Sequence, residues 1–155
     1  MEKVIVDTGA LYALVDKSDK WHRKVKDFIE NNNPLLIIPC SILPEVCYLV
    51  NKYLGQELEI TFLKSLIDSE ILLVDITAND IKNAIKYMER YKDRNLGFVD
   101  AIVLSIAERL RVYRILTIDR RDFSGIKIGK KKLNTFTLVA IRSTCVVVVT
   151  FKYSI

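Results

Sequence analysis

The sequence is poor in the residues that build zinc sites and disulfide frameworks. Its 155 residues include a single histidine, His22, and three cysteines. The cysteines, Cys40, Cys47 and Cys145, are odd in number and lack zinc-like spacing, and one histidine leaves little for an imidazole-based metal site. We expect the three cysteines to be buried, reduced thiols.

Long apolar stretches are also missing. The longest late run, Cys145–Phe151, is far shorter than a membrane-crossing helix, which needs about 20 residues. Near the start, Glu2 and Asp7 bracket the short apolar run Lys3–Val6, whereas a signal peptide needs a longer uncharged stretch. The sequence therefore predicts a soluble, cytoplasmic protein that makes no membrane contact.

Linkers, repeats and low-complexity tracts are absent, so the sequence offers no boundary between two folding units. Half of the residues are hydrophobic, which is enough to bury one sizeable core. The 24 Lys and Arg exceed the 19 Asp and Glu, and the net charge of +5 favours a polyanionic partner, either nucleic acid or an anionic membrane. We predict one domain, residues 1–140, and a β-rich tail, residues 141–155, whose role is left open between an added strand, an oligomer contact and an aggregation liability.

Hydrophobic periodicity alternates between strands and helices along the chain. Apolar residues three and four apart predict helices over Lys20–Glu30, Ile42–Tyr53, Glu57–Ser69, Ile81–Tyr91 and Val99–Leu110. Continuous apolar runs predict strands over Lys3–Val6, Leu35–Ile38, Ile71–Val74 and Arg114–Ile118, with Thr135–Ile141 as a fifth. This alternation predicts an α/β fold with a mostly parallel sheet.

Turn and capping residues mark the helix boundaries. We expect Asn31–Pro34 to break one helix and Ser41 to cap the next, with Pro44 tolerated in its first turn. The segment Thr77–Asp80 resembles a capping box and predicts another helix start.

Acidic residues stand at the ends of these elements. Asp7 directly follows the first strand and Asp119 follows Arg114–Ile118, so both belong at the carboxyl edge of the sheet, where open α/β folds bind ligands. Glu45 and Asp100 lie near the starts of two helices that leave the same edge. The sequence therefore predicts that four acids converge.

Four converging carboxylates favour a particular kind of cation. Clustered carboxylates raise one another's pKa unless a cation is present. A set of oxygen ligands without histidine or cysteine selects Mg²⁺ or Mn²⁺ over zinc. Such an ion can activate a water molecule and neutralise charge on a leaving oxygen, so the predicted chemistry is phosphodiester hydrolysis.

Four ordered motifs carry a resemblance to a known family: Val6–Leu11, Leu43–Val46, Gly97–Ala101 and Leu116–Phe123. Their residues, order and spacing resemble PIN-domain nucleases, especially the VapC-type toxins of toxin–antitoxin pairs, over approximately residues 1–138. The resemblance implies a three-layer α/β/α sandwich with a central five-stranded parallel sheet for residues 1–140. It also implies a metal-dependent endoribonuclease in which the catalytic metal ligands are Asp7, Glu45, Asp100 and Asp119, with Thr8 and Thr117 as supporting groups.

Further residues are secondary candidates. Asp93 matches an acidic position in a subset of such toxins and reads equally well as a solvated turn residue. A basic rim follows the last acid and could hold RNA phosphates or simply form a soluble face; it comprises Arg120, Arg121, Lys127, Lys130, Lys131 and Lys132. The resemblance further implies an antitoxin partner and a homodimer.

Two other function classes stay open at this point. A phosphoacceptor signalling domain also places aspartates at strand ends around Mg²⁺, although it usually has paired acids after the first strand and a late lysine; phosphorylation of Asp75 would point to it. A PIN-like module that binds RNA without cleaving it is the other alternative.

Overall fold

A parallel five-stranded sheet forms the centre of the protein. The computed structural model describes residues 2–118, 123, 125–128, 131, 132 and 134–137. The strands of the sheet are β1 (Lys3–Val6), β2 (Leu35–Pro39), β3 (Leu72–Val74), β4 (Arg114–Thr117) and β7 (Asn134–Thr137). Their spatial order is β3-β2-β1-β4-β7, and each neighbouring pair is parallel. The predicted α/β class and parallel five-stranded sheet are confirmed.

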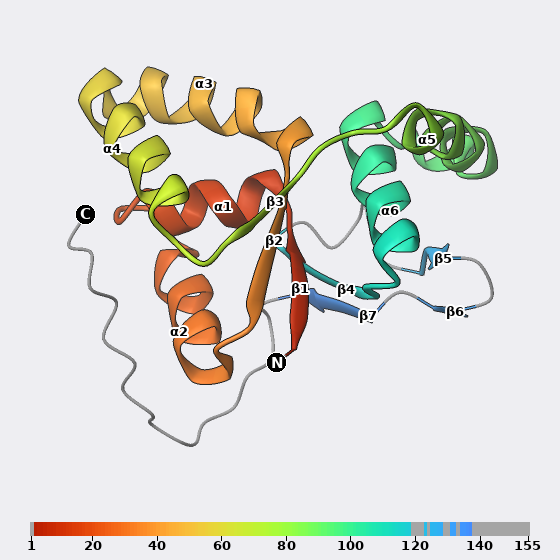
Figure 1. Ribbon diagram of the computed structural model, residues 1–155, viewed down its shortest axis with the longest axis horizontal. Coiled ribbons are helices and arrows are strands. Elements are labelled where there is room, and N and C mark those ends of the chain that lie inside the picture. The colour runs from red at the N-terminus through yellow and green to blue at the C-terminus, as the bar shows by residue number, and fades with distance from the viewer. Residues whose placement is uncertain (1, 119–122, 124, 129–130, 133, 138–155) are drawn as a thin grey trace.

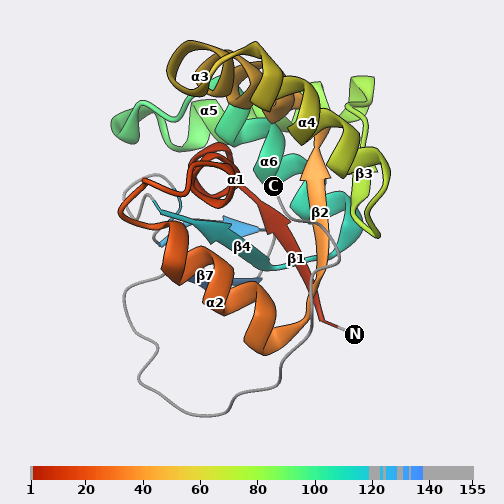
Figure 2. The ribbon, with the colours of Figure 1, turned by 90° about the vertical axis from the view of Figure 1, so that its left-hand side faces the viewer.

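Helices cover the sheet on both faces. Figure 1 shows α1 and α2 on one side of the strands and α6, with α5 outside it, on the other. Figure 2 shows β1 and β2 pointing toward the end of the molecule where α3 and α4 lie. The three-layer arrangement is therefore confirmed. The helices are α1 (Thr8–Val15), α2 (His22–Asn32), α3 (Leu43–Leu54), α4 (Gln56–Ile67), α5 (Ala78–Arg90) and α6 (Phe98–Leu110).

Three short elements complete the described chain. Two are 3₁₀ turns: η1 (Cys40–Ile42) leads into α3, and η2 (Lys92–Arg94) follows α5. The third is a separate antiparallel hairpin made of β5 (Lys127–Ile128) and β6 (Lys131–Lys132). Nothing in the hydrophobic pattern predicted this hairpin.

The core is made of aliphatic strands packed against aliphatic helix faces. Val4 and Ile5 of β1 are fully buried, and so are Ile115 and Leu116 of the neighbouring β4. Burying each such side chain contributes about 1.5–3 kcal/mol. The apolar runs are continuous because helices cover both faces of these strands. On the α6 side, Ile102, Leu104 and Ile106 are also fully buried.

One boundary prediction needs correction. Ser41 does not cap α3: η1 intervenes, Ile42 is the residue before the helix, and the buried Ser41 Oγ has no hydrogen-bond partner among the described residues. The segment Asn31–Pro34 ends a helix, as predicted: α2 runs to Asn32 and stops there because Asn33 adopts the left-handed conformation, with φ of 40°.

The other boundary predictions are confirmed. Pro44 lies in the first turn of α3, and Thr77 forms the expected capping box with Asp80. Within the described range, the predicted fifth strand begins one residue earlier than expected, at Asn134, and residues 138–141 of that prediction lie outside it.

Two predictions from the sequence concern the cysteines and membrane-spanning helices. Cys40 and Cys47 are free and half-buried, and desolvation raises the pKa of both thiols, whereas Cys145 lies outside the described residues. No helix in the described part of the chain has the length and apolar character needed to span a bilayer.

Candidate acidic active site

The order of the strands creates a point of reversal at the carboxyl edge of the sheet. From the central β1 the chain moves outward through β2 to β3, and then returns to place β4 on the other side of β1. Open parallel sheets bind ligands outside the carboxyl ends of the strands at such a point. Asp7 follows β1 and Thr117 ends β4, and the backbone N–H of Asp7 donates to the carbonyl of Leu116 at 3.0 Å. Both residues therefore stand where a ligand is expected.

Each oxygen of the Asp7 carboxylate accepts a hydrogen bond within the described part of the chain. Its Oδ1 accepts the backbone N–H of Thr8 at 2.7 Å, and its Oδ2 accepts the hydroxyl of Thr117 at 2.8 Å. Asp7 is only 7% exposed and caps α1, whose N-terminus favours negative charge. Thr117 is fully buried, so this carboxylate has a fixed orientation.

Thr8 joins Asp7 to Glu45. The backbone of Thr8 donates to Asp7, while its hydroxyl donates to Glu45 Oε2 at 3.1 Å. Glu45 lies in the first turn of α3 and is exposed. The structure thus brings Asp7, Thr8, Glu45 and Thr117 into one hydrogen-bonded group. The sequence signal for this bridge was only that a threonine follows the first aspartate.

Asp100 and Asp93 lie on two further elements, α6 and η2. Asp100 lies in the first turn of α6 and is half-buried, and its Oδ2 would lie 3.5 Å from a Cβ at Gly97, the residue before that helix. Asp93 is an exposed residue in η2. The assignment of both acids to the site stays a prediction.

The chemical type of these oxygen ligands suits a hard divalent cation. Carboxylates of Asp7, Glu45 and Asp100 are ligands that Mg²⁺ and Mn²⁺ prefer. However, within residues 2–118 and the later described segments, no three His, Cys, Asp or Glu side chains are gathered closely enough to hold a metal. Asp119, the fourth predicted ligand, lies outside the described residues, as do Arg120, Arg121 and Lys130; the backbone of Lys131 is described, in β6.

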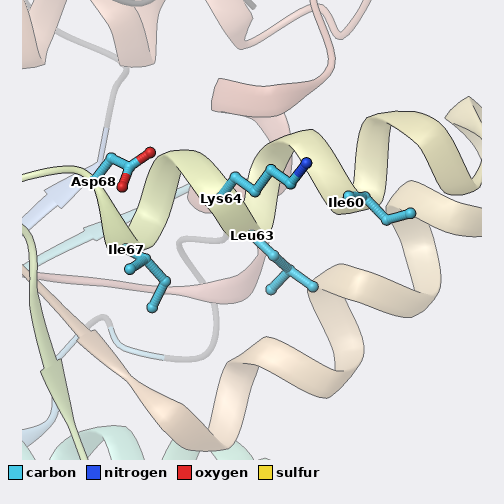
Figure 3. Close-up of a pocket in the computed structure, with 5 residues that line it drawn as sticks. All are labelled: Ile60, Leu63, Lys64, Ile67 and Asp68. Carbon is cyan, nitrogen blue, oxygen red and sulfur yellow. The ribbon is translucent and has the colours of Figure 1, made fainter.

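An apolar hollow lies elsewhere in the described chain. Ile60, Leu63 and Ile67 form a stripe along α4 and line a shallow hollow with Lys64 and Asp68 (Figure 3). Ile67 is 75% exposed. An apolar stripe of this kind suits contact with another macromolecule, not chemistry, because it offers no group that could activate a water molecule.

Comparison with known proteins decides the family. The family model described as "PIN domain" matches residues 4–128, which include the segments that carry Asp7, Glu45 and Asp100. The chain belongs to the PIN-domain family.

Relatives of this PIN domain agree with that assignment. The chain is 32% identical over 124 residues to Ribonuclease VapC26 of Mycobacterium tuberculosis, covering 80% of this chain and 92% of that protein. Its fold resembles VapC20 of the same organism, described as a sarcin–ricin loop cleaving toxin, with a TM-score of 0.72 and 20% identity over 81% of this chain and 97% of that one. It also resembles a toxin–antitoxin complex from Klebsiella pneumoniae, with a TM-score of 0.65 and 23% identity over 89% of this chain and 99% of that one.

Membership of the PIN-domain family bears on the two alternative functions that the sequence left open. It favours a nuclease over a phosphoacceptor, and Asp75 stands exposed after β3, the outermost strand, away from the point of reversal. The PIN-domain match ends at residue 128, and residues 138–155 lie outside the described residues. The division of the chain at residue 140 therefore stays a prediction.

Proposed function

We propose that this PIN domain is a divalent-metal-dependent endoribonuclease and the toxin of a toxin–antitoxin pair. The observation that carries the proposal is the Asp7 carboxylate. It is buried at the carboxyl edge between β1 and β4, oriented by Thr117, and linked through Thr8 to a second acid, Glu45. The 32% identity to a ribonuclease of the same family over most of both chains supports the same activity.

The proposed site divides its work between ligands and positioning groups. Asp7, Glu45, Asp100 and Asp119 would hold Mg²⁺ or Mn²⁺, with Asp93 as a secondary candidate. With an ion bound, these residues would have beside them a water of lowered pKa and a positive charge that would neutralise the charge growing on the leaving oxygen. Thr117 keeps one oxygen of Asp7 directed, and the Thr8 hydroxyl keeps Glu45 beside it. Basic side chains after β4, Arg120, Arg121, Lys130 and Lys131, would hold substrate phosphates.

Loss of single carboxylates tests the proposal. We expect Asp7→Asn and Asp100→Asn to abolish cleavage of tRNA, rRNA or mRNA in Mg²⁺ while the folded state is retained. Asp68→Asn, on the exposed end of α4, is the matched control and should cleave like the parent. A chelator should stop cleavage by the parent, and re-addition of Mg²⁺ or Mn²⁺ should restore it. Parental rates in both active-site variants would refute the assigned site, and metal-independent cleavage would refute the metal.

The same set of variants separates an enzyme from a binding module. A PIN-like domain that only binds RNA would bind it in the parent and in Asp100→Asn without producing cut ends in either protein. Mapping the cut ends by primer extension also identifies the target RNA. Acting on cellular RNA would place the protein in the cytoplasm.

The proposed partner is a cognate antitoxin. Support comes from the family and from fold neighbours that are toxin–antitoxin complexes. The apolar stripe on α4 adds a surface on which a partner could bury area (Figure 3). Expression of this chain alone should arrest growth, and co-expression with the small reading frame beside its gene should restore it. A homodimer is proposed on family grounds alone, and sedimentation of the purified chain tests it.

A further inference from the structure

The exposed side of α3 carries a lysine between two tyrosines. Tyr48 and Tyr53 are each 60% exposed. The Lys52 ammonium lies 5.5 Å from the centre of the Tyr48 ring and 5.1 Å from the centre of the Tyr53 ring. Hydrogen bonding to Tyr48 and Tyr53 raises the pKa of Lys52, so the lysine carries its charge at neutral pH. No carboxylate among the described residues forms an ion pair with it.

The lysine and the first tyrosine continue a face of α3 that starts at the proposed active site. Glu45, Tyr48 and Lys52 follow one another at spacings of three and four residues, so they share one face of the helix. A helix rises about 1.5 Å per residue, so Lys52 lies about 10 Å along the axis from Glu45. Glu45 accepts the hydroxyl of Thr8, which also donates its backbone N–H to Asp7. The lysine and tyrosine therefore lie next to the acidic group.

Acidic residues limit the second tyrosine on two sides. The helix α1 packs against α3 (Figures 1 and 2). Burial raises the pKa of Tyr12 in α1 to about 12, and Asp16 and Tyr53 add to the shift, so these side chains lie near one another. On the other side, Glu57 and Glu59 stand in the first turn of α4. These carboxylates repel a polyanion from Tyr53 and direct it over Tyr48 and Lys52.

An exposed ring beside an unpaired cation suits a single-stranded nucleic acid. Unpaired bases stack on aromatic rings while basic groups follow the phosphates. A phosphate would also give Lys52 the anion that no described carboxylate supplies. The stripe on α4 differs, because Ile60, Leu63 and Ile67 are aliphatic and offer no ring for a base. The chemistry of α3 therefore favours RNA, whereas that of α4 favours a protein.

We propose that Tyr48 and Lys52 form an RNA-binding site beside the acidic active site. The Tyr48 ring stacks on a base of the substrate strand, and the Lys52 ammonium binds a phosphate of the same strand. Tyr53 holds the lysine from its other side. This assignment rests on the proposed ribonuclease function and extends it to the nucleotides that flank the cleaved bond.

Three substitutions of Tyr48 test the stacking contact. The probe is a fluorescently labelled single-stranded RNA of about 12 nucleotides, titrated with the full chain in chelator. Tyr48→Ala should weaken binding about 5- to 150-fold, and Tyr48→Phe should bind nearly as tightly as the parent because the ring is kept. Tyr48→Leu keeps an apolar side chain without a ring and should bind as weakly as the alanine variant.

The matched control for the tyrosine is Ile85→Ala. Ile85 is a 49% exposed apolar residue on α5, which covers the other face of the sheet, so this variant should bind RNA like the parent (Figure 1). Parental affinity in Tyr48→Ala or in Tyr48→Leu would refute stacking, and so would a parent that binds no RNA.

The salt dependence of binding tests the phosphate contact. For single strands, each phosphate contact contributes about 0.7 to the slope of log K against log salt concentration. We expect Lys52→Ala to reduce the slope by about that amount and Lys52→Arg to keep it. Lys82→Ala, at an exposed position on α5, is the matched control and should leave the slope unchanged. A parental slope in Lys52→Ala would overturn the phosphate contact.

Cleavage in Mg²⁺ gives a second readout. A contact away from the reacting bond is equally strong in the ground state and in the transition state, so its loss raises KM and leaves kcat unchanged. We expect this pattern in Tyr48→Ala and in Lys52→Ala. If both variants bind RNA like the parent but change the oligomeric state in sedimentation, this face of α3 joins two copies of the chain and the proposal is wrong.

The two proposals fail separately. If Asp100→Asn is inactive but the Tyr48 and Lys52 variants bind RNA like the parent, the ribonuclease assignment stands and only this RNA-binding site is refuted. If Asp100→Asn cleaves RNA at the parental rate, the assigned active site is refuted whatever the binding results are.

Discussion

Replacing Thr117 with valine removes the hydroxyl that donates to Asp7. Valine has nearly the same shape, so the fully buried position keeps its packing. The lost hydrogen bond, 2.8 Å from the Thr117 hydroxyl to Asp7 Oδ2, ends on a carboxylate that is 7% exposed. Hydrogen bonds to charged groups contribute about 1.5–3 kcal/mol. Asp7 keeps its bond from the Thr8 backbone, so we expect the variant to fold with a free energy of unfolding lower by about that amount.

Urea and thermal unfolding in metal-free buffer measure this loss. For a chain of this length, about 1.5–3 kcal/mol corresponds to a melting temperature lower by about 3–12 °C. Thr61→Val is the control, because the Thr61 hydroxyl donates to the Glu57 carbonyl on the exposed surface of α4, and its loss should change stability by less than about 0.5 kcal/mol. Thr117→Ser restores the hydroxyl and should recover much of the bond.

Activity gives a second, independent measurement. Thr117 acts through Asp7, and removal of a group that orients a metal ligand typically lowers metal affinity or activity about 10- to 100-fold. We expect the Mg²⁺ concentration needed for half-maximal cleavage to rise in Thr117→Val and to return toward the parental value in Thr117→Ser. A Thr117→Val protein with parental stability and parental Mg²⁺ dependence would show that the hydroxyl does not orient Asp7.

Two other contacts give shorter predictions. Burial raises the pKa of Asp80, but hydrogen bonds from Thr77 and the guanidinium of Arg109, at 3.0 Å, outweigh it and leave that pKa lowered. The stability from this carboxylate is therefore present above its unfolded-state pKa and lost as pH falls through the lowered value. Arg109→Met should cost about 1–3 kcal/mol in urea at pH 7 and flatten the acid limb of the stability curve; an unchanged acid limb would contradict the pairing. Gly9→Ala would bring a Cβ to 2.8 Å from Cγ1 of Ile118. It should therefore destabilise the protein by about 1 kcal/mol in urea despite the helical preference of alanine, and a stabilised variant would refute the close contact.

The elements and the first acids were predictable because their signals are local. The apolar run before Asp7 and the apolar run after Asn33 and Pro34 each predict a strand from neighbouring residues alone. The strand lengths and most helix ends agree with the structure to within a few residues. The parallel sheet followed from the alternation of strands and helices, and the apolar runs and the family resemblance both gave five strands.

The misses share a physical cause, which is that the deciding contact is not local or the element is too short. Ser41 has the chemistry of a cap, but the 3₁₀ turn η1 displaces it from the helix start. The hydroxyl of Thr8 reaches Glu45, 37 residues away, and no periodicity reports such a contact. The β5–β6 hairpin consists of two-residue strands rich in lysine, which carry no alternating pattern.

The bond between Thr117 and Asp7 joins residues 110 positions apart. A ribosome has therefore synthesised most of the chain before the first aspartate acquires the hydroxyl that directs it. Fragments released by premature termination before β4 lack that hydroxyl altogether. Such fragments also lack β4, the strand that pairs with β1 on one side, so the edge of the sheet that carries Asp7 is incomplete in them.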